Sequence, residues 1–283
     1  MKHFIIVTNQ IKDPDFEVTH EIVTCLERES CTASVYTGEI TKAQWEEILR
    51  REAKATDGIL VLGGDGTLLR TARDTVDSQI PVLGINLGTL GYLAEVERGS
   101  LGPALDKLVR GEYDVEKRMM LSGQVLRGGQ VLEDTCALND ITITRNGRLQ
   151  MLYFLIYVNG KLLKEYYADG IILATPTGST GYNMSAGGPI VEPGAEMILL
   201  TPICAHTLQT RSVVLRAEDE ITIRIRERMG RENQPMEVCF DGSQNLALKP
   251  GDEVRITRSE KHIPVIKLGE ASFLDVLHRK MSE

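Results

Sequence analysis

The sequence lacks a long apolar run, a paired cysteine motif and an excess of positive charge. No window approaches the roughly eighteen consecutive apolar residues of a membrane-spanning helix. The five cysteines are scattered and include no Cys-x-x-Cys, which argues against a disulfide framework and against a structural zinc site. A formal net charge of −8 disfavours general attraction to nucleic acid or to an anionic membrane. We therefore expect a protein of the reducing cytoplasm that binds neither nucleic acid nor membranes.

The composition is that of a globular protein with room for two domains. The chain has 283 residues, of which 42% are hydrophobic and 25% are charged. A chain of this length buries a sizeable core without disulfides or metals. Its first residues, "MKHFIIVTN", contain one lysine and a very short apolar run, so we predict a β-strand there and not a signal peptide.

Strand and helix patterns alternate over the first third of the chain. The runs "FIIVTN", "GILVLGG" and "IPVLGIN" are continuously apolar, which is typical of parallel strands covered on both faces. Helical spacing follows in residues 16–30, in residues 41–55 with Thr41 as N-cap, and in residues 67–77. We predict a doubly wound, Rossmann-like α/β domain over residues 1–118, with ligands at the carboxyl ends of its strands.

The pattern changes after Arg118. Short alternating runs such as "ITITRN" and "DEVRITRS" are separated by Gly- and Asn-rich turns, which indicates a β-rich second domain over residues 119–261. The last helix-like run, "SFLDVLHRKM", lies in residues 262–283, and we expect this segment to pack back on the first domain.

One acidic residue, Asp65, stands among three glycines where a strand passes into a helix, in "GGDGT". Gly63, Gly64 and Gly66 permit close backbone approach and positive φ, and the amides at the start of the helix suit phosphate. The stretch has neither the Gly-Lys-Ser/Thr of a Walker A loop nor the spacing G-x-G-x-x-G. Two hypotheses stay open: Asp65 caps a tight turn, or it acts on a group brought beside the phosphates.

A second glycine turn follows the next strand, in "GINLGTLGYL". Asn86, Gly88 and Thr89 lie there, and two neighbouring glycine-rich strand ends suggest a crevice. The alternative is a wide loop that leads into the next helix.

The most unusual segment is "YYADGIILATPTGSTGYNMSAGGPIVEPG", residues 166–194, which joins a strand to a dense run of Thr, Ser and Gly without helical or strand periodicity. Its hydroxyls and amides suit ribose and phosphate oxygens, and so long a loop in a compact domain is usually functional. Asn139-Asp140, taken alone, is typical of a turn, and Asp241-Gly242 of a hairpin turn. A lone His206 is more often a hydrogen-bonded structural residue than a base.

Taken together, these stretches resemble the NAD kinase family. "GGDGT", "NLGTLGYL", "LND" and "DGIILATPTGSTGYNMSAGGPIV" occur in the family's order from about residue 58, and "TPICAHTL" and "FDG" follow, ending at residue 242. "GGDGT" is shared with diacylglycerol and sphingosine kinases, whereas the Thr/Ser/Gly loop is much more specific. The resemblance implies phosphorylation of the adenosine 2′-hydroxyl of NAD to NADP, with ATP or polyphosphate as donor and a divalent metal such as Mg²⁺. It also implies a homodimer or homotetramer.

The resemblance assigns roles to individual residues. Asp65 becomes the general base or the group that orients the hydroxyl. The implied phosphate and ATP contacts are Gly63, Gly64, Gly66, Thr67, Asn86, Gly88 and Thr89. The implied NAD contacts are Asp65, Gly66, Arg70, Asn139, Asp140, Asp169, Thr177, Thr180, Gly181, Tyr182, Asn183, Met184 and Ser185. The metal ligands are not identified.

The sequence also departs from the family and leaves two rivals. Gly181 stands where the family usually has Ala, Ala205 replaces a Pro, and "YYADG" lacks the basic or Gly residue often found before "DG". One rival is a lipid kinase of the same superfamily, for which we find no amphipathic basic stretch. The other is a non-catalytic NAD sensor, against which the intact Asp65 argues.

Overall fold

The computed structural model contains two compact units. Unit 1 comprises Met1–Arg118 and His262–Glu283, and unit 2 comprises Met119–Lys261. The chain passes from one unit to the other within the strands β6 (Asp114–Arg127) and β17 (Glu253–Lys267). The structure describes residues 2–88, 91–147, 151–206, 211–226, 235–269 and 272–282.

Unit 1 is built on a parallel sheet in the order β2-β1-β3-β4, to which the end of β17 adds at Val265 beside Val82. Every residue of β3 and β4 is buried, as the continuously apolar runs predict for strands covered on both faces. The strands of this unit are β1 (His3–Thr8), β2 (Thr32–Thr37), β3 (Gly58–Gly63), β4 (Val82–Asn86) and β5 (Val96–Glu97).

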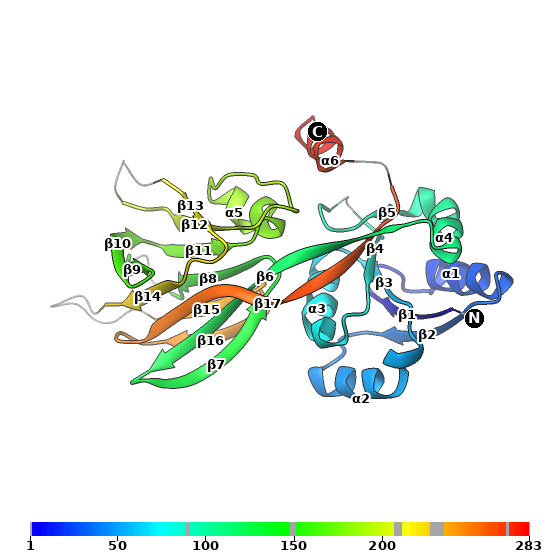
Figure 1. Cartoon of the computed structure of the whole chain (residues 1–283), viewed down its shortest axis with the longest axis horizontal. Helices are drawn as coiled ribbons and strands as arrows, with labels where there is room; N and C mark the ends of the chain where they lie inside the picture. Colours follow the sequence, from blue (N-terminus) through cyan, green and yellow to red (C-terminus); the bar gives the residue numbers. More distant parts are fainter. Residues whose placement is uncertain are drawn as a thin grey trace. The chain divides into compact units, whose positions relative to one another are not determined.

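Helices cover both faces of this sheet (Figure 1). One face packs against α1 and α4, where Phe4 and Leu60 join Ile22 and Leu105 in one buried cluster. Helices α2 and α3 contact each other, and α2 begins with the predicted Thr41 cap. The helices are α1 (Glu17–Arg28), α2 (Lys42–Glu52), α3 (Asp65–Thr75), α4 (Leu101–Arg110), α6 (Phe273–Met281) and the 3-10 turns η1 (Ala53–Ala55), η2 (Val76–Ser78) and η3 (Arg98–Ser100). The α/β prediction for this part is confirmed.

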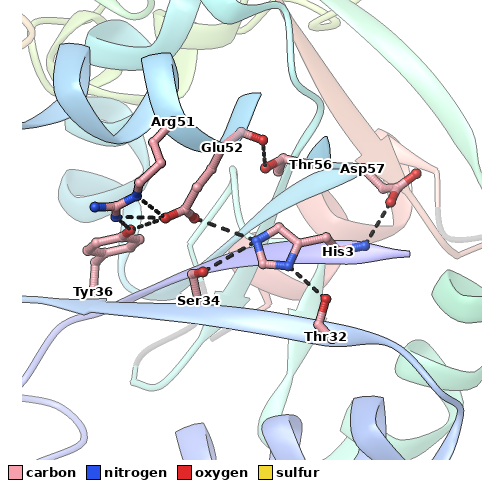
Figure 2. Close-up of polar contacts among 8 residues, drawn as sticks. All are labelled: His3, Thr32, Ser34, Tyr36, Arg51, Glu52, Thr56 and Asp57. Carbon is pink, nitrogen blue, oxygen red and sulfur yellow. Dashed lines mark hydrogen bonds and ion pairs between the residues drawn. The ribbon is translucent and has the colours of Figure 1, made fainter. Parts of the chain in front are cut away.

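A polar network ties α2 to the amino-terminal ends of β1 and β3 (Figure 2). Glu52 at the end of α2 accepts hydrogen bonds from Tyr36 Oη at 2.6 Å and from Arg51 Nη2 at 2.7 Å. Its second oxygen lies 3.5 Å from His3 Nε2, and the His3 amide donates to Asp57. Burial alone raises the pKa of Glu52, but the bonds from Tyr36 and Arg51 outweigh it and lower the pKa to about 2. These contacts fix the end of α2 against β1 and β2.

Unit 2 is β-rich and antiparallel, as predicted. One sheet has the order β13-β12-β11-β8-β15-β16. In addition, neighbouring strands are hydrogen-bonded in the order β10-β9-β14-β17, and β6 pairs with β7. Inward residues such as Ile143, Phe154, Ile223 and Val238 form one core. The strands are β7 (Gln130–Ala137), β8 (Asp140–Arg145), β9 (Leu152–Val158), β10 (Lys161–Ala168), β11 (Gly170–Ala174), β12 (Met197–Ile203), β13 (Val213–Arg216), β14 (Ile221–Ile225), β15 (Met236–Phe240) and β16 (Gln244–Leu248).

Two connections of unit 2 bear on the site. The Thr/Ser/Gly segment is not free of regular structure, because it holds the 3-10 turn η4 (Thr177–Thr180) and the short helix α5 (Tyr182–Ser185). The predicted hairpin turn is confirmed: Asp241 and Gly242 join β15 to β16 with φ of 48° and 68°. Within the described residues, no helix has the length and apolar character needed to cross a bilayer.

Candidate functional site

The glycine turn of unit 1 leads β3 directly into α3. Gly64 is the N-cap residue, and its carbonyl accepts bonds from the amides of Thr67 at 3.0 Å and Leu68 at 3.2 Å. Asp65 is the first residue of the helix, and no side-chain cap is formed. The hypothesis that Asp65 caps the turn is therefore wrong for this geometry.

The Asp65 carboxylate is held on one side only. Its Oδ2 accepts the Tyr92 amide at 3.1 Å, while its buried Oδ1 has no hydrogen-bond partner within the described part of the chain. Gly91 packs against the carboxylate so closely that any side chain there would collide with it. The result is an acid fixed in position with one oxygen uncommitted.

Two of the three glycines of this turn lie in crowded surroundings. Glycine permits positive φ, but Gly63, Gly64 and Gly66 do not adopt it. A Cβ at Gly63 would lie 2.7 Å from Thr67 Oγ1, and one at Gly64 would lie 2.6 Å from Lys12 Nζ. Around Gly66 nothing lies within 4 Å, so its backbone faces open space.

Lys12 is a component of this turn that sequence reasoning missed. Its ammonium lies beside Gly64 and also beside Gly88, where a Cβ would be 3.0 Å away. The loop is fixed because the Lys12 amide donates to the Asn9 carbonyl at 3.0 Å and Asn9 Nδ2 donates to Thr67 Oγ1 at 3.0 Å. No carboxylate in the described ranges pairs with Lys12. Its position just beyond the first parallel strand was the available signal.

The second glycine turn lies against the first within unit 1. The Leu87 amide donates to the Gly63 carbonyl at 3.0 Å. Asn86 is buried and bonds to Gly88 twice, through Nδ2 at 3.1 Å and Oδ1 at 3.0 Å, so its side chain shapes the turn. Thr89 lies outside the described residues. Arg70, one turn further along α3, pairs with Glu39 at 2.6 Å.

In unit 2, the Asn139-Asp140 pair is positioned by a residue that the sequence suggested only as a hairpin turn. Asp241 accepts the amides of Leu138 at 2.8 Å, Asn139 at 2.7 Å and Asp140 at 3.2 Å. Its own amide donates to the Asp140 carbonyl at 3.0 Å. The left-handed backbone of Asp241 makes this arrangement possible, and the carboxylate organises the strand end opposite.

Asp140 is buried next to this second carboxylate. Desolvation first, and then the nearby charge of Asp241, raise the pKa of Asp140 to about 7. The adjacent Asn139 Oδ1 is buried and has no partner among the residues described. A Cβ at Gly181 would lie 3.5 Å from Asn139 Nδ2 and 3.9 Å from Asp140 Oδ2, so both side chains face the Thr/Ser/Gly segment.

The predicted NAD contacts of this segment differ in exposure. Thr177 and Asn183 are buried, Thr180 and Gly181 are half-buried, and Tyr182, Met184 and Ser185 are exposed. Asn183 Nδ2 donates to the Ser179 and Pro189 carbonyls, and its Oδ1 accepts from Thr201 at 2.7 Å. The Asn183 side chain is thus used to shape the loop, and its expected contact with NAD stays a prediction.

Asp169 forms a two-bond ion pair. Arg145 Nε and Nη2 donate to its two carboxylate oxygens at 2.9 and 3.2 Å. The bonds to Asp169 raise the pKa of Arg145. The sequence has no basic residue immediately before the "DG", and the cation beside Asp169 is Arg145, at the end of β8. Sequence reasoning did not identify it.

Comparisons with known proteins bear on both units. Residues 4–113 match the family model of the ATP-NAD kinase N-terminal domain, and residues 138–268 match that of the ATP-NAD kinase C-terminal domain. The NAD kinase of Agathobacter rectalis is 46% identical over 282 residues, covering 99% of each chain. The NAD kinase of Caldanaerobacter subterraneus is 40% identical over 288 residues, covering 100% of each chain.

Solved structures agree with these sequence matches. Yeast NADH kinase complexed with NADH superimposes with a TM-score of 0.86 at 25% identity, covering 99% of this chain and 88% of that one. An NAD kinase from Archaeoglobus fulgidus in complex with ATP gives 0.78 at 25% identity, with coverage of 100% and 99%. The resemblance found in the sequence is confirmed, and the chain belongs to the ATP-NAD kinase family.

Proposed function

We propose that this chain transfers the γ-phosphoryl group of ATP to the adenosine 2′-hydroxyl of NAD, which yields NADP and ADP. The observation that carries the proposal is the Asp65 carboxylate, fixed by the Tyr92 amide with Oδ1 uncommitted at the carboxyl end of a parallel sheet. Ligands of doubly wound folds bind at such strand ends.

The residues of unit 1 support a phosphoryl transfer. Asp65 Oδ1 accepts the proton of the 2′-hydroxyl as the oxygen forms a bond to the γ-phosphorus and the bond to the β-phosphate oxygen breaks. The amides and dipole at the start of α3 face the donor phosphates, as does the Lys12 ammonium between the two glycine turns. Arg70, one helical turn on, is a further proposed phosphate contact.

The residues of this turn fit a divalent metal only when the substrate supplies phosphate oxygens as further ligands. When bound, Mg²⁺ neutralises charge on the donor phosphates, and proteins typically hold it through one or two carboxylates, phosphate oxygens and waters. In the described part of the chain no group of three or more His, Cys, Asp or Glu converges. Because Asp65 Oδ1 is assigned to the hydroxyl proton and Oδ2 accepts the Tyr92 amide, we propose that the ion would be held mainly by the donor phosphate oxygens and waters.

The dinucleotide is assigned to unit 2. Asn139 and Asp140 present their side chains to the Thr/Ser/Gly segment, whose exposed residues include Tyr182, Met184 and Ser185, and Asp169 lies at the start of the strand that leads into it. The yeast neighbour was solved with NADH and the archaeal one with ATP, which supports nucleotides of both kinds as ligands. A cytoplasmic homodimer or homotetramer remains part of the proposal.

The test is a substrate comparison. We expect incubation with ATP, Mg²⁺ and NAD to give NADP, detected with an NADP-specific dehydrogenase. Phosphorylation of diacylglycerol or of a sphingoid base without NADP formation would support the lipid-kinase rival. NAD binding with no phosphorylation of any acceptor would support the sensor. Replacing ATP by polyphosphate in the same assay identifies the donor.

A further inference from the structure

The loop that fixes Asp65 is itself held by residues near the carboxyl-terminal end of the chain. The Tyr92 amide donates to Asp65 Oδ2 at 3.1 Å, and Gly91 packs against the same carboxylate. A shift of this backbone therefore moves the acid or breaks its hydrogen bond. We call residues 91–97 the Tyr92 segment, which leads from these contacts into β5. The contacts of this segment within unit 1 determine where Asp65 stands.

Glu95 anchors the middle of the Tyr92 segment. Its amide donates to a carbonyl of β4 at 3.0 Å, and its side chain is only 10% exposed. Glu95 Oε1 accepts the amides of Leu268 at 3.2 Å and Gly269 at 3.0 Å. Its Oε2 pairs with the Lys267 ammonium. The segment is thus joined to the parallel sheet on one side and to the end of β17 on the other.

Helix α6 contacts the Tyr92 segment on either side of this anchor. The Lys280 ammonium lies 5.2 Å from the centre of the Tyr92 ring, within the roughly 6 Å over which a cation is attracted to a ring face. Arg279 Nη1 lies 2.7 Å from Glu97 Oε1. Two adjacent residues of α6 therefore hold both ends of the segment, and one of them holds the residue that positions the acid.

The attachment of α6 is too slight to matter much for global stability. None of the nine residues of α6, all of which the structure describes, is buried, and Leu274 and Met281 are 68% and 72% exposed. The Arg279–Glu97 pair is about half exposed on both sides, and such pairs contribute little to the free energy of unfolding. An element attached in this way detaches at far less cost than a core strand. Its effect is therefore local and falls on the Tyr92 segment.

We propose that α6 is a positioning element for the phosphoryl transfer, in which Lys280 holds the Tyr92 ring and the Tyr92 amide in turn orients the Asp65 carboxylate. The inference rests on the proposed function, which assigns the hydroxyl proton to Asp65 Oδ1. Reaction rates depend steeply on the placement of a catalytic group, so a loosened Tyr92 segment lowers kcat. Lys280 acts through Tyr92 and is a positioning residue, not a catalytic one.

The kinetic test removes the cation and then restores it. Lys280→Met should lower kcat about three- to fivefold, the size of an exposed cation–π contact expressed as a rate ratio. KM for ATP and KM for NAD should stay within about twofold, and the melting temperature should not change. Lys280→Arg keeps a cation over the ring and should restore the kcat of the parent. An unchanged kcat in Lys280→Met, or no recovery in Lys280→Arg, overturns the proposal.

A matched control and a double variant show where Lys280 acts. Lys54→Met makes the same substitution on the exposed surface of unit 1 and should leave kcat unchanged. In the Asp65→Asn background the carboxylate to be oriented is absent, so Lys280→Met should cause no further loss of kcat. The same three- to fivefold loss, at about the level seen with Asp65 present, would assign the contact to another step and contradict the proposal.

Hydrogen exchange tests the link without any turnover. In the protein without substrate, NMR should show the Tyr92 amide exchanging about three- to fivefold faster in Lys280→Met than in the parent, and Lys54→Met should match the parent. Equal exchange in Lys280→Met and the parent overturns the proposal even if NADP is formed. Faster exchange in a protein that forms no NADP would reject the proposed function and leave Lys280 as the residue that orders Tyr92. The two failures are thus distinguished.

Discussion

The same dipeptide, Asp-Gly, occurs at a strand end in each unit and is used in opposite ways. Asp65 begins a helix, accepts one backbone amide and leaves Oδ1 buried without a partner in the described chain. Asp241 has a left-handed backbone and accepts three backbone amides. A carboxylate whose two oxygens both accept backbone amides stabilises the local structure. A carboxylate that is fixed by one amide and has its other oxygen without a partner is available for chemistry. Hydrogen-bond accounting therefore separates two residues that are alike in sequence context.

The largest expected effect comes from Asp65→Asn. Asn keeps a carbonyl oxygen for the Tyr92 amide but cannot accept the hydroxyl proton, so we predict that kcat falls roughly 10²-fold or more. Steady-state kinetics, a melting curve and an NAD titration measure it, and stability and NAD affinity should change little. A stable variant with near-full turnover would remove the distinction between the two Asp-Gly pairs.

The converse experiment is Asp241→Ala, which should affect folding first. Three amides lose their acceptor and an alanine must adopt φ of 48°, so we expect a loss of about 2–3 kcal/mol in the free energy of unfolding. Urea denaturation measures it. Asp241→Asn, which tolerates the same backbone and retains one acceptor oxygen, should lose less. An alanine variant as stable as the parent would show that the clamp has no energetic role.

The pH dependence of Asp140 tests the consequence of placing it beside Asp241. Because its pKa rises to about 7 in the fold from an ordinary value of 3.8, the folded state binds more protons than the unfolded state between these pH values. Stability should therefore fall as pH rises through this window. Asp140→Asn removes the cost of ionising a buried carboxyl group. We therefore expect its free energy of unfolding to exceed that of the parent by about 2 kcal/mol at pH 8 and by little at pH 4. Parallel pH profiles of the two proteins would contradict this.

Lys12→Met tests whether the Lys12 ammonium contributes to the site that contains the Asp65 carboxylate. Removing the ammonium between the two glycine turns should raise KM for ATP about tenfold, an effect of about 1.4 kcal/mol, and leave KM for NAD nearly unchanged. Lys54→Met is the matched control on the exposed surface of unit 1. Equal behaviour of the two variants would remove Lys12 from the site.

The smallest effect is expected at Glu52, an acid of unit 1 with a purely structural setting. Its pKa is lowered from an ordinary value of 4.5 to about 2, so its contribution to stability is fully present above pH 4.5 and is lost as pH falls through 2. We predict that Glu52→Gln lowers stability by about 1 kcal/mol at pH 7, after allowance for solvent screening, with kcat unchanged. In thermal melts, the difference between parent and variant should be smaller at pH 2.5 than at pH 7.

Local features of this fold could be read from the sequence. The continuously apolar runs predicted the buried strands β3 and β4, and Thr41 predicted the start of α2, because each depends on neighbouring residues. The glycines were recognised because they permit close approach and positive φ; in the fold Gly63 is crowded by Thr67 and Gly64 lies beside Lys12, and neither has a positive φ.

The missed residues share one property, which is that distant partners define them. Asp241 bonds to the amide of Asn139, 102 positions earlier, and Arg145 pairs with Asp169, 24 positions later. Lys12 meets glycines at positions 64 and 88. Nothing in the residues that flank these three predicts such contacts, because the pairing of strands creates them.

The return of the chain to unit 1 through β17 has a consequence for biosynthesis. Val265 pairs with Val82, Ile266 and Leu268 enter the core of unit 1, and Lys107 Nζ donates to the Leu268 carbonyl at 3.0 Å. Domains usually fold in the order in which the ribosome releases them. Here residues 119–261 are complete while unit 1 still lacks its last strand, so the nascent chain must carry an unfinished amino-terminal sheet until its final residues emerge.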